Sequence, residues 1–211
     1  DLADLQALDR LIRAVKPQIV VNASAYTAVD RAEEEQTIAM TINARVPGVM
    51  AEAARALDAA LIHYSTDYVF DGAKGALYVE GDAPNPLNVY GQSKLEGEQV
   101  IAQVGGAYLI LRTSWVYGLG VGGFVSKTLS WARTQEVLKV VTDQVGSPTW
   151  ARMLAEVSGS LIARSLPDSK MVFSERSGVY HLGGAGSVSR FDFAREILNL
   201  DPHPEEQKVK R

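Results

Sequence analysis

The sequence predicts an α/β fold built on a doubly wound parallel sheet. Three short apolar runs have the length and composition of buried strands, and they occupy residues 18–22, 61–65 and 108–112. Segments with helical spacing of apolar residues separate them, and strands that alternate with helices are typical of parallel sheets. The second run leads to Thr66 and Asp67, which would stand at the carboxyl edge of the sheet, where ligands bind in such folds.

The helices and loops of the first half follow from periodicity and from helix breakers. A helix is expected near the start, where apolar residues recur at helical spacing between Leu5 and Val15. A longer helical region is expected over residues 30–57, with a bend near Pro47. The remaining expected elements are a loop of small residues at 23–28, a loop rich in Gly, Pro and Asn at 71–88, and a helix from Tyr90 to about Gln103.

The second half of the chain has a looser pattern. The expected elements, in order, are loops at 115–118 and 120–123, a helix at 124–134, a strand at 137–142, a turn-rich link at 143–149, a helix at 151–164, a strand at 178–182 and a helix from about Ser189. Ser189 is a good capping residue for that last helix. We expect this half to complete the outer layer of the sheet and to form a small C-terminal cap.

Composition narrows the classes of partner. The chain has 211 residues, 46% of them hydrophobic, a net charge of −4 and no cysteine. No sustained basic stripe is present, so nucleic acid is not an expected partner. No apolar run approaches the ~20 residues needed to cross a bilayer, so no membrane association is expected either. Absence of cysteine rules out disulfides and thiol chemistry and fits a cytoplasmic protein.

The segment Tyr90-Gly-Gln-Ser-Lys94 carries the clearest chemical signal. Residues four apart on a helix share a face, so the Lys94 ammonium is expected beside the Tyr90 phenol. A nearby positive charge favours phenolate, and the Tyr90 pKa is therefore expected to fall from its ordinary value. Such a phenol can protonate a carbonyl oxygen while a hydride reaches the carbon, and the Thr66 hydroxyl can share the developing charge. These are the parts of a nicotinamide-dependent ketone reductase.

Other polar residues allow more than one interpretation. The run at 33–35, three glutamates, fits a solvated acidic helix turn, or a contact with Mg²⁺ or another subunit. His63, His181 and His203 share no spacing typical of metal ligands, and the first two are expected to be satisfied core residues. Arg112 suits either an internal ion pair or a nucleotide phosphate.

Five linked motifs make the chain resemble the dTDP-4-dehydrorhamnose reductases, within the extended short-chain dehydrogenase/reductases. These motifs are Asn22-Ala-Ser-Ala-Tyr-Thr-Ala-Val-Asp30, Tyr64-Ser-Thr-Asp-Tyr-Val-Phe-Asp-Gly72, Pro86-Leu-Asn-Val-Tyr-Gly-Gln-Ser-Lys-Leu-Glu-Gly-Glu98, Arg112-Thr-Ser-Trp-Val-Tyr117 and Asp143-Gln-Val-Gly-Ser-Pro-Thr149. The resemblance implies a Rossmann-like fold with a small C-terminal substrate-binding cap. It also implies that NADPH, or NADH, reduces the 4-keto group of dTDP-4-dehydro-L-rhamnose to give dTDP-L-rhamnose for surface polysaccharide.

The resemblance also implies roles for particular residues. Tyr90 is the implied proton donor, Lys94 lowers its pKa and bonds the nicotinamide ribose, and Thr66 tunes the carbonyl end. Asp67 is expected to touch the sugar, and Trp115 to pack against the substrate, although Trp115 also suits plain core.

The cofactor is expected to contact two further places on the chain. Ala25, Tyr26 and Thr27 match the loop beside its phosphates and ribose. Asp1 and Leu2 match positions near its adenine. Mg²⁺ and a homodimer also occur in relatives and stay open for this chain.

The resemblance divides the chain by function as well. Residues 1–112, with 150–165 packed on them, are expected to form the Rossmann-like portion that binds the cofactor. Residues 113–149 and 166–211 are expected to be mainly the substrate-binding portion. The glycine-rich turn with which the family opens has no counterpart here, so we expect the N-terminal strands to be missing from this sequence.

Two alternatives to the reductase stay open. The first is another sugar-nucleotide reductase, epimerase or dehydratase of the same superfamily; a dehydratase is less favoured because Tyr68, not Glu, follows Asp67. The second is a non-catalytic regulatory subunit, since relatives of this fold bind methionine adenosyltransferase. Turnover of NADPH by the purified protein would separate these classes.

Overall fold

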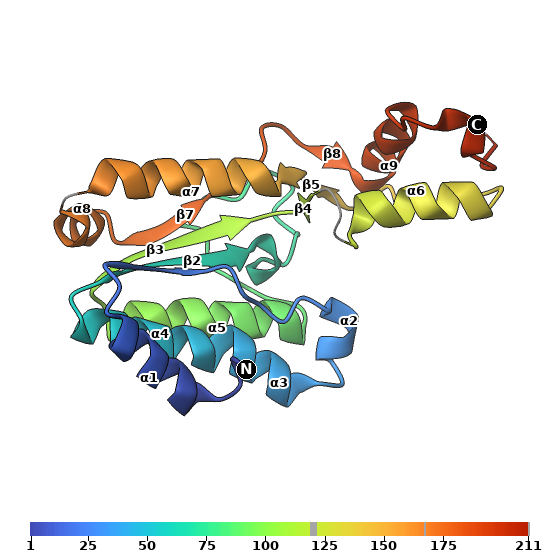
Figure 1. Cartoon of the computed structure of the whole chain (residues 1–211). Helices are drawn as coiled ribbons and strands as arrows, with labels where there is room; N and C mark the ends of the chain where they lie inside the picture. Colours follow the sequence, from blue (N-terminus) through green and yellow to red (C-terminus); the bar gives the residue numbers. More distant parts are fainter. Residues whose placement is uncertain (119–121, 167, 211) are drawn as a thin grey trace. The chain divides into compact units, whose positions relative to one another are not determined.

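The computed structural model describes residues 1–118, 122–166 and 168–210, and the chain forms two compact units (Figure 1). The first unit contains residues 1–113 and 160–182, and the second contains residues 114–159 and 183–211. Within the described residues, no helix is both long and apolar enough to cross a bilayer. Each unit is described separately below.

The first unit is built on a parallel sheet. Its strands in the described residues are β1 (Ile19–Asn22), β2 (Ala60–Thr66), β3 (Ala107–Thr113) and β7 (Gly178–His181), in the order β1-β2-β3-β7. All neighbouring pairs are parallel, and the register places Asn22 beside His63 and Thr66 beside Thr113. Parallel strands covered on both faces are expected to be almost continuously apolar. The buried His63 and Asn22 are exceptions to that pattern.

One face of this sheet is covered by α1 (Leu5–Val15), α4 (Val46–Ala56) and α5 (Val89–Val104), which Figure 1 shows below the strands. Asp4 caps α1, since its carboxylate accepts a hydrogen bond from the Ala7 N–H at 2.9 Å. The core on this face is a cluster of apolar side chains, among them Leu8, Ile12, Val46, Met50, Leu61, Ile101 and Ile110.

The other face is covered by α8 (Ser169–Glu175) and the C-terminal part of α7 (Ala151–Ser165). Phe173 is buried here with Ile62 and Leu109, and Leu161 and Ile162 pack against them. α8 was not foreseen from the sequence. The Asp168 carboxylate caps it by accepting a hydrogen bond from the Met171 N–H at 3.1 Å.

The long helical region expected over 30–57 is interrupted. It consists of α2 (Val29–Ala32), α3 (Gln36–Met40), a π-helical segment (η1, Thr41–Arg45) and α4. In the π-helical segment the Val46 N–H donates to the Thr41 carbonyl, five residues back. Pro47 has no N–H, so the usual bond to residue 43 cannot form. The irregularity therefore lies in the turn before Pro47, where the sequence predicts the bend.

In its described residues, the second unit has short strand pairs, two whole α-helices and the N-terminal part of α7. β4 (Val116–Tyr117) pairs parallel with β6 (Thr149–Trp150), and β5 (Val145–Gly146) pairs antiparallel with β8 (Val188–Ser189). The helices are α6 (Phe124–Thr134) and α9 (Arg190–Asn199), the latter capped by the Ser189 hydroxyl.

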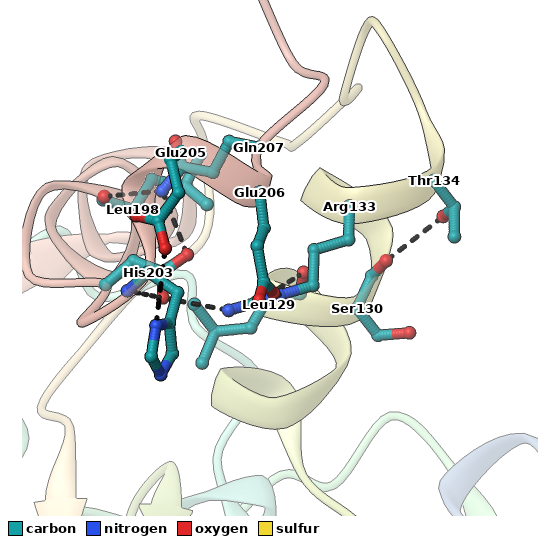
Figure 2. A network of polar contacts seen from close by, with 10 residues as sticks. Leu129, Ser130, Arg133, Thr134, Leu198, His203, Glu205, Glu206 and Gln207 are labelled. Carbon is teal, nitrogen blue, oxygen red and sulfur yellow. Dashed lines mark hydrogen bonds and ion pairs between the residues drawn. The ribbon is translucent and has the colours of Figure 1, made fainter.

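An ion-pair network fixes the C-terminal segment to α6. Figure 2 shows Arg133 directed toward the short η3 turn (Pro204–Glu206), where its guanidinium contacts Glu206 at 2.6 Å. The same side chain contacts the buried carboxylate of Asp201 at 3.0 Å. The unit is thus held by its own polar contacts as well as by packing.

Several predictions for the second half are wrong. Residues 137–142, all of them described, form no strand, and Val137 and Val141 remain 66% and 48% exposed. An apolar run forms a strand only where another strand is available to pair with it. The link expected at 143–149 contains β5, and β4 lies in the loop expected at 115–118. Part of the loop expected at 120–123 lies outside the described residues.

The division into units also differs from the expected one. Residues 166–182 belong to the sheet-containing unit, and 150–159 to the other. The first segment of the sheet-containing unit ends at Thr113. The assignment of cofactor and substrate to separate portions stays a prediction.

Candidate active site

Thr66 and Asp67 lie where β2 ends and the short 3₁₀ turn η2 (Asp67–Val69) begins. The buried Thr66 hydroxyl accepts a hydrogen bond from the Tyr68 N–H and donates one to Asp67 Oδ1, both at 3.2 Å. This capping contact turns the chain sharply at the carboxyl edge of the sheet. The hydroxyl is therefore held in a fixed position by its own backbone.

Tyr90 lies in the first turn of α5, partly buried. Asn88 caps this helix by accepting a hydrogen bond from the Gly91 N–H at 2.7 Å. The Tyr90 ring makes an edge-to-face contact with Tyr68, with ring centroids 5.4 Å apart. A hydrogen bond joins its phenol to the Thr66 side chain. The structure thus brings together two of the residues expected to be catalytic.

The pKa of Tyr90 is shifted upward, opposite to the expected fall. Burial raises the pKa of Tyr90 to about 12, and the hydrogen bond with Thr66 only partly offsets this. The negative side chain of Asp67 raises the Tyr90 pKa further. The expected lowering by Lys94 is wrong for this structure, because the Lys94 Nζ atom contacts the Tyr64 carbonyl and His63 instead.

Lys94 lies on α5, one helical turn after Tyr90. Its Nζ atom donates to the Tyr64 carbonyl at 2.6 Å and lies 3.2 Å from His63 Nε2. Burial lowers the pKa of Lys94 to about 8, and the negative charge of Glu98 acts in the opposite direction. Lys94 is therefore poised between amine and ammonium near neutral pH.

A buried ion pair lies next to Lys94. The Glu98 carboxylate accepts hydrogen bonds from Arg112 Nη2 at 2.6 Å and Arg112 Nε at 2.9 Å, and from the Ser65 hydroxyl at 2.5 Å. Of the two interpretations of Arg112, the internal ion pair is confirmed. Sequence reasoning missed Glu98, although it follows Lys94 by one helical turn on the same face.

The loop at 23–28 is fastened to the neighbouring helices. The Tyr26 N–H donates to Asn43 Oδ1 at 2.8 Å, and the Tyr26 phenol donates to Glu35 at 2.5 Å. That bond and the one from Arg31 lower the pKa of Glu35. Ala25 is partly buried and Thr27 is exposed. Their expected contact with a cofactor stays a prediction.

The expected adenine contacts lie at the start of the chain. Asp1 is exposed and accepts a hydrogen bond from the Ala3 N–H at 2.9 Å. Leu2 packs against the apolar core cluster that contains Leu8 and Ile12 of α1. Their expected contact with a cofactor stays a prediction.

Trp115 belongs to the second unit and has a left-handed backbone, with φ of 44°. The Arg190 guanidinium lies 3.5 Å from its ring centroid, and Phe193 stacks at 6.2 Å. Gly146 also packs closely, since a Cβ there would lie 2.5 Å from the indole. Much of the ring therefore contacts its own unit, and the expected packing against substrate stays a prediction.

The residues considered as metal ligands do not form a convincing site. Glu33 accepts a hydrogen bond from the Val89 N–H, and Glu35 is bonded to Tyr26 and Arg31. Among the described residues, the ligand atoms of His203, Glu205 and Glu206 do lie close together, but all are exposed and Glu206 pairs with Arg133 (Figure 2).

The three histidines differ in their surroundings. His63 is a buried, hydrogen-bonded residue, as expected. His181 is only partly buried, and its buried Nε2 atom has no hydrogen-bond partner in the described structure, so the expectation of a satisfied residue is wrong there.

Comparison with known proteins supports the resemblance drawn from the motifs. The family model described as the RmlD substrate binding domain matches residues 1–210. The chain is 41% identical over 198 residues to dTDP-4-dehydrorhamnose reductase of Burkholderia thailandensis, covering 94% of this chain and 66% of that protein. It is 40% identical to the Escherichia coli K12 enzyme over 198 residues, with 94% and 64% covered.

A solved structure extends the comparison to the fold. The Bacillus anthracis dTDP-4-dehydrorhamnose reductase in complex with NADP matches with a TM-score of 0.87 and 35% identity, covering 100% of this chain and 70% of that one. The predicted α/β, Rossmann-like fold is confirmed. The chain spans about two thirds of the length of the curated relatives it matches.

Proposed function

This chain belongs to the RmlD substrate binding domain family, and we propose that its protein reduces dTDP-4-dehydro-L-rhamnose to dTDP-L-rhamnose with NADPH. The observation that carries the proposal is the partly buried Tyr90 phenol, hydrogen-bonded to Thr66 at the carboxyl edge of the sheet, one helical turn from Lys94. The names of the relatives support the substrate, and the NADP complex of the Bacillus anthracis enzyme supports the cofactor.

In this proposal, Tyr90 is the acid. When bound, the reduced nicotinamide supplies a hydride to the sugar C4 carbonyl carbon. With a pKa of about 12, the Tyr90 phenol is fully protonated at neutral pH and has a proton to give to the carbonyl oxygen. Thr66, bonded to the same phenol, fixes the position of the phenol oxygen. General acid catalysis of this kind typically contributes ~10²–10⁴-fold.

The residues present suit such a cofactor. The buried Lys94 nitrogen at the end of β2 is a donor of the kind that a ribose hydroxyl needs, and Thr113 Oγ1 is a buried hydroxyl without a partner in the described structure. We assign the ribose of the nicotinamide to Lys94, and the phosphates to the loop of Ala25, Tyr26 and Thr27.

The remaining assignments concern the adenine of the cofactor and the sugar of the substrate. The adenine is assigned to Asp1 and Leu2, and the sugar to Asp67 and Trp115. NADH in place of NADPH, a homodimer and a cytoplasmic location stay predictions. The carboxylates of Glu33 and Glu35 have protein partners, so they give no support to Mg²⁺.

The test uses the protein at its full natural length. We expect loss of reduced-nicotinamide absorbance when it is mixed with NADPH and dTDP-4-dehydro-L-rhamnose, and a fall in kcat of ~10²-fold or more in Tyr90→Phe. Tyr68→Phe is the matched control, because it removes a neighbouring phenol and keeps its ring contact. Near-normal turnover by Tyr90→Phe would contradict the assignment. No turnover by folded, cofactor-bound wild type would favour an epimerase or the regulatory-subunit alternative.

A further inference from the structure

A series of hydrogen-bonded, buried polar side chains runs from Asn22 on β1 to Lys94 on α5. Asn22 Nδ2 lies 2.9 Å from His63 Nδ1, and His63 Nε2 lies 3.2 Å from Lys94 Nζ. The exposed fractions of these residues are 2%, 0% and 2% in that order. Polar groups with so little access to water must satisfy one another, so the direction of each hydrogen bond matters.

Ser24 determines how the Asn22 amide is oriented. The Ser24 backbone N–H lies 3.1 Å from Asn22 Oδ1, and the Ser24 hydroxyl donates to the same oxygen at 2.7 Å. A backbone N–H can only donate, so the amide atom that faces it must be the oxygen. The amide nitrogen then faces His63, and Asn22 donates its hydrogen to His63 Nδ1.

The direction at Nδ1 determines the tautomer of His63. Burial lowers the pKa of His63 well below its ordinary range, so the ring is neutral. A neutral imidazole carries one hydrogen, and the nitrogen that accepts a bond cannot carry it. The hydrogen is therefore on Nε2, which faces Lys94 Nζ. An ammonium has no lone pair to accept it, whereas an amine has one.

We propose that His63 is a positioning residue that donates its Nε2 hydrogen to the free amine of Lys94. The same amine donates one of its own hydrogens to the Tyr64 carbonyl, so both bonds fix the nitrogen. Lys94 is thus held ready to accept a proton. Its importance for turnover rests on the proposed function, but the direction of the hydrogen bonds does not.

Other charged groups near Lys94 act against this preference. Glu98 lies one turn further along α5 and favours the ammonium, but its carboxylate is bonded to Arg112 from β3 and to Ser65 from β2. Tyr90, one turn earlier on α5, is neutral at physiological pH because of its raised pKa. The arrangement therefore leaves His63 as the group in direct contact that distinguishes amine from ammonium.

The first test reads the tautomer directly, without cofactor or substrate. In protein with ¹⁵N-labelled histidine, two-bond ¹H–¹⁵N correlations distinguish Nε2–H from Nδ1–H, and loss of a signal in His63→Gln assigns it. We expect neutral His63 with Nε2–H at pH 9, above the Lys94 pKa of about 8, where the amine predominates. Finding Nδ1–H, or a doubly protonated ring, at that pH would overturn the proposal. Because nothing is turned over, this result is independent of whether the reductase assignment holds.

The second test reverses the direction of the hydrogen bond between Asn22 and His63. Asn22→Asp keeps an oxygen for the Ser24 N–H but places a second acceptor at His63 Nδ1, so we expect the tautomer to switch to Nδ1–H. Asn22→Ala is the matched control, since it removes the donor without adding charge and should leave a mixture of tautomers. If Asn22→Asp folds and keeps Nε2–H, the argument from Asn22 is wrong.

The third test measures Lys94 itself. The ¹³Cε and ¹⁵Nζ shifts of Lys94 are followed against pH in wild type, His63→Gln and His63→Leu. Leucine cannot stabilise the amine, so the Lys94 pKa should rise by about one unit, a tenfold change in the amine-to-ammonium ratio. The Gln side chain, which can donate, should restore most of the wild-type value. The pH profile of kcat should shift in parallel. A folded His63→Leu variant with an unchanged Lys94 pKa would leave His63 a merely structural residue.

Discussion

The buried ion pair beneath the site gives the sharpest stability prediction. The Glu98 and Arg112 residues are only 3% and 6% exposed, and Glu98 accepts hydrogen bonds from Arg112 Nε, Arg112 Nη2 and Ser65. Glu98→Gln keeps the size of the side chain but removes its charge. The Arg112 guanidinium would then be a buried cation without a counter-charge, and its Nη1 atom already lacks a partner in the described structure.

The expected magnitude follows from that burial. Removing one partner of a buried, hydrogen-bonded pair typically costs about 3–5 kcal/mol, because the remaining charge is left uncompensated. The cation–π contact of Arg112 with Phe70, at 5.0 Å, is too weak to replace the carboxylate. With a slope of about 2 kcal/mol per molar urea, the midpoint of unfolding should fall by about 1.5–2.5 M.

The assay is equilibrium unfolding in urea followed by circular dichroism. Glu156→Gln is the matched control, since it makes the same change in an exposed pair with Arg152 on α7. Such surface pairs contribute about 0.5 kcal/mol or less. The reasoning would be refuted if Glu98→Gln lost less than about 1 kcal/mol, or no more than Glu156→Gln. Glu98→Gln should also lower the Lys94 pKa further, because Glu98 raises it.

Two further predictions concern packing and pH. Gly97→Ala should destabilise the protein by about 1–3 kcal/mol in the same urea assay, because its Cβ would lie 2.2 Å from the Asn43 carbonyl oxygen. Gly159→Ala, on α7 with open space around it, should instead add about 0.5–1 kcal/mol, and equal effects of the two changes would contradict the packing argument. The pKa of Asp71 is lowered to about 2 from 3.8, chiefly by the Tyr78 hydroxyl, so the carboxylate stabilises the fold above pH ~4 and this contribution is lost as pH falls toward 2. The stability difference between wild type and Asp71→Asn should therefore shrink over that interval in thermal melts, and a constant difference would show that Asp71 is not the titrating group.

Patterns that depend on local sequence predicted their elements well. The helix Leu5–Val15 lies where the apolar spacing predicts one, because that spacing and the Asp4 cap act within one segment. The run at 137–142 has strand-like composition but forms no strand among its described residues, and composition alone cannot tell whether a partner strand is present. α8 was missed because its short sequence is stabilised by Phe173 against a sheet assembled from distant segments.

The candidate site shows the same limit at the level of single side chains. Spacing placed Tyr90 and Lys94 one turn apart on a helix, which the structure confirms. It could not show that the Lys94 stem turns toward the Tyr64 carbonyl and His63, because the direction of a long side chain depends on its tertiary partners. Asn22 and His63 are 41 residues apart, and only the register of β1 with β2 places them side by side.

The raised pKa of Tyr90 is compatible with an acid role for a simple reason. An acid must carry its proton when the substrate arrives, and a pKa of about 12 ensures this over the whole physiological range. The alkoxide formed by hydride addition is more basic still, so proton transfer from the phenol is downhill once the carbonyl is reduced. In the proposed mechanism the phenolate left behind then needs a proton, and Lys94, with a pKa of about 8, can pass its proton on and regain one from water near neutral pH. A permanently charged lysine would stabilise the phenolate and slow this recovery, whereas a lysine that His63 holds as an amine can exchange protons. In the proposed mechanism, Tyr90 therefore gives the proton and Lys94 controls its replacement.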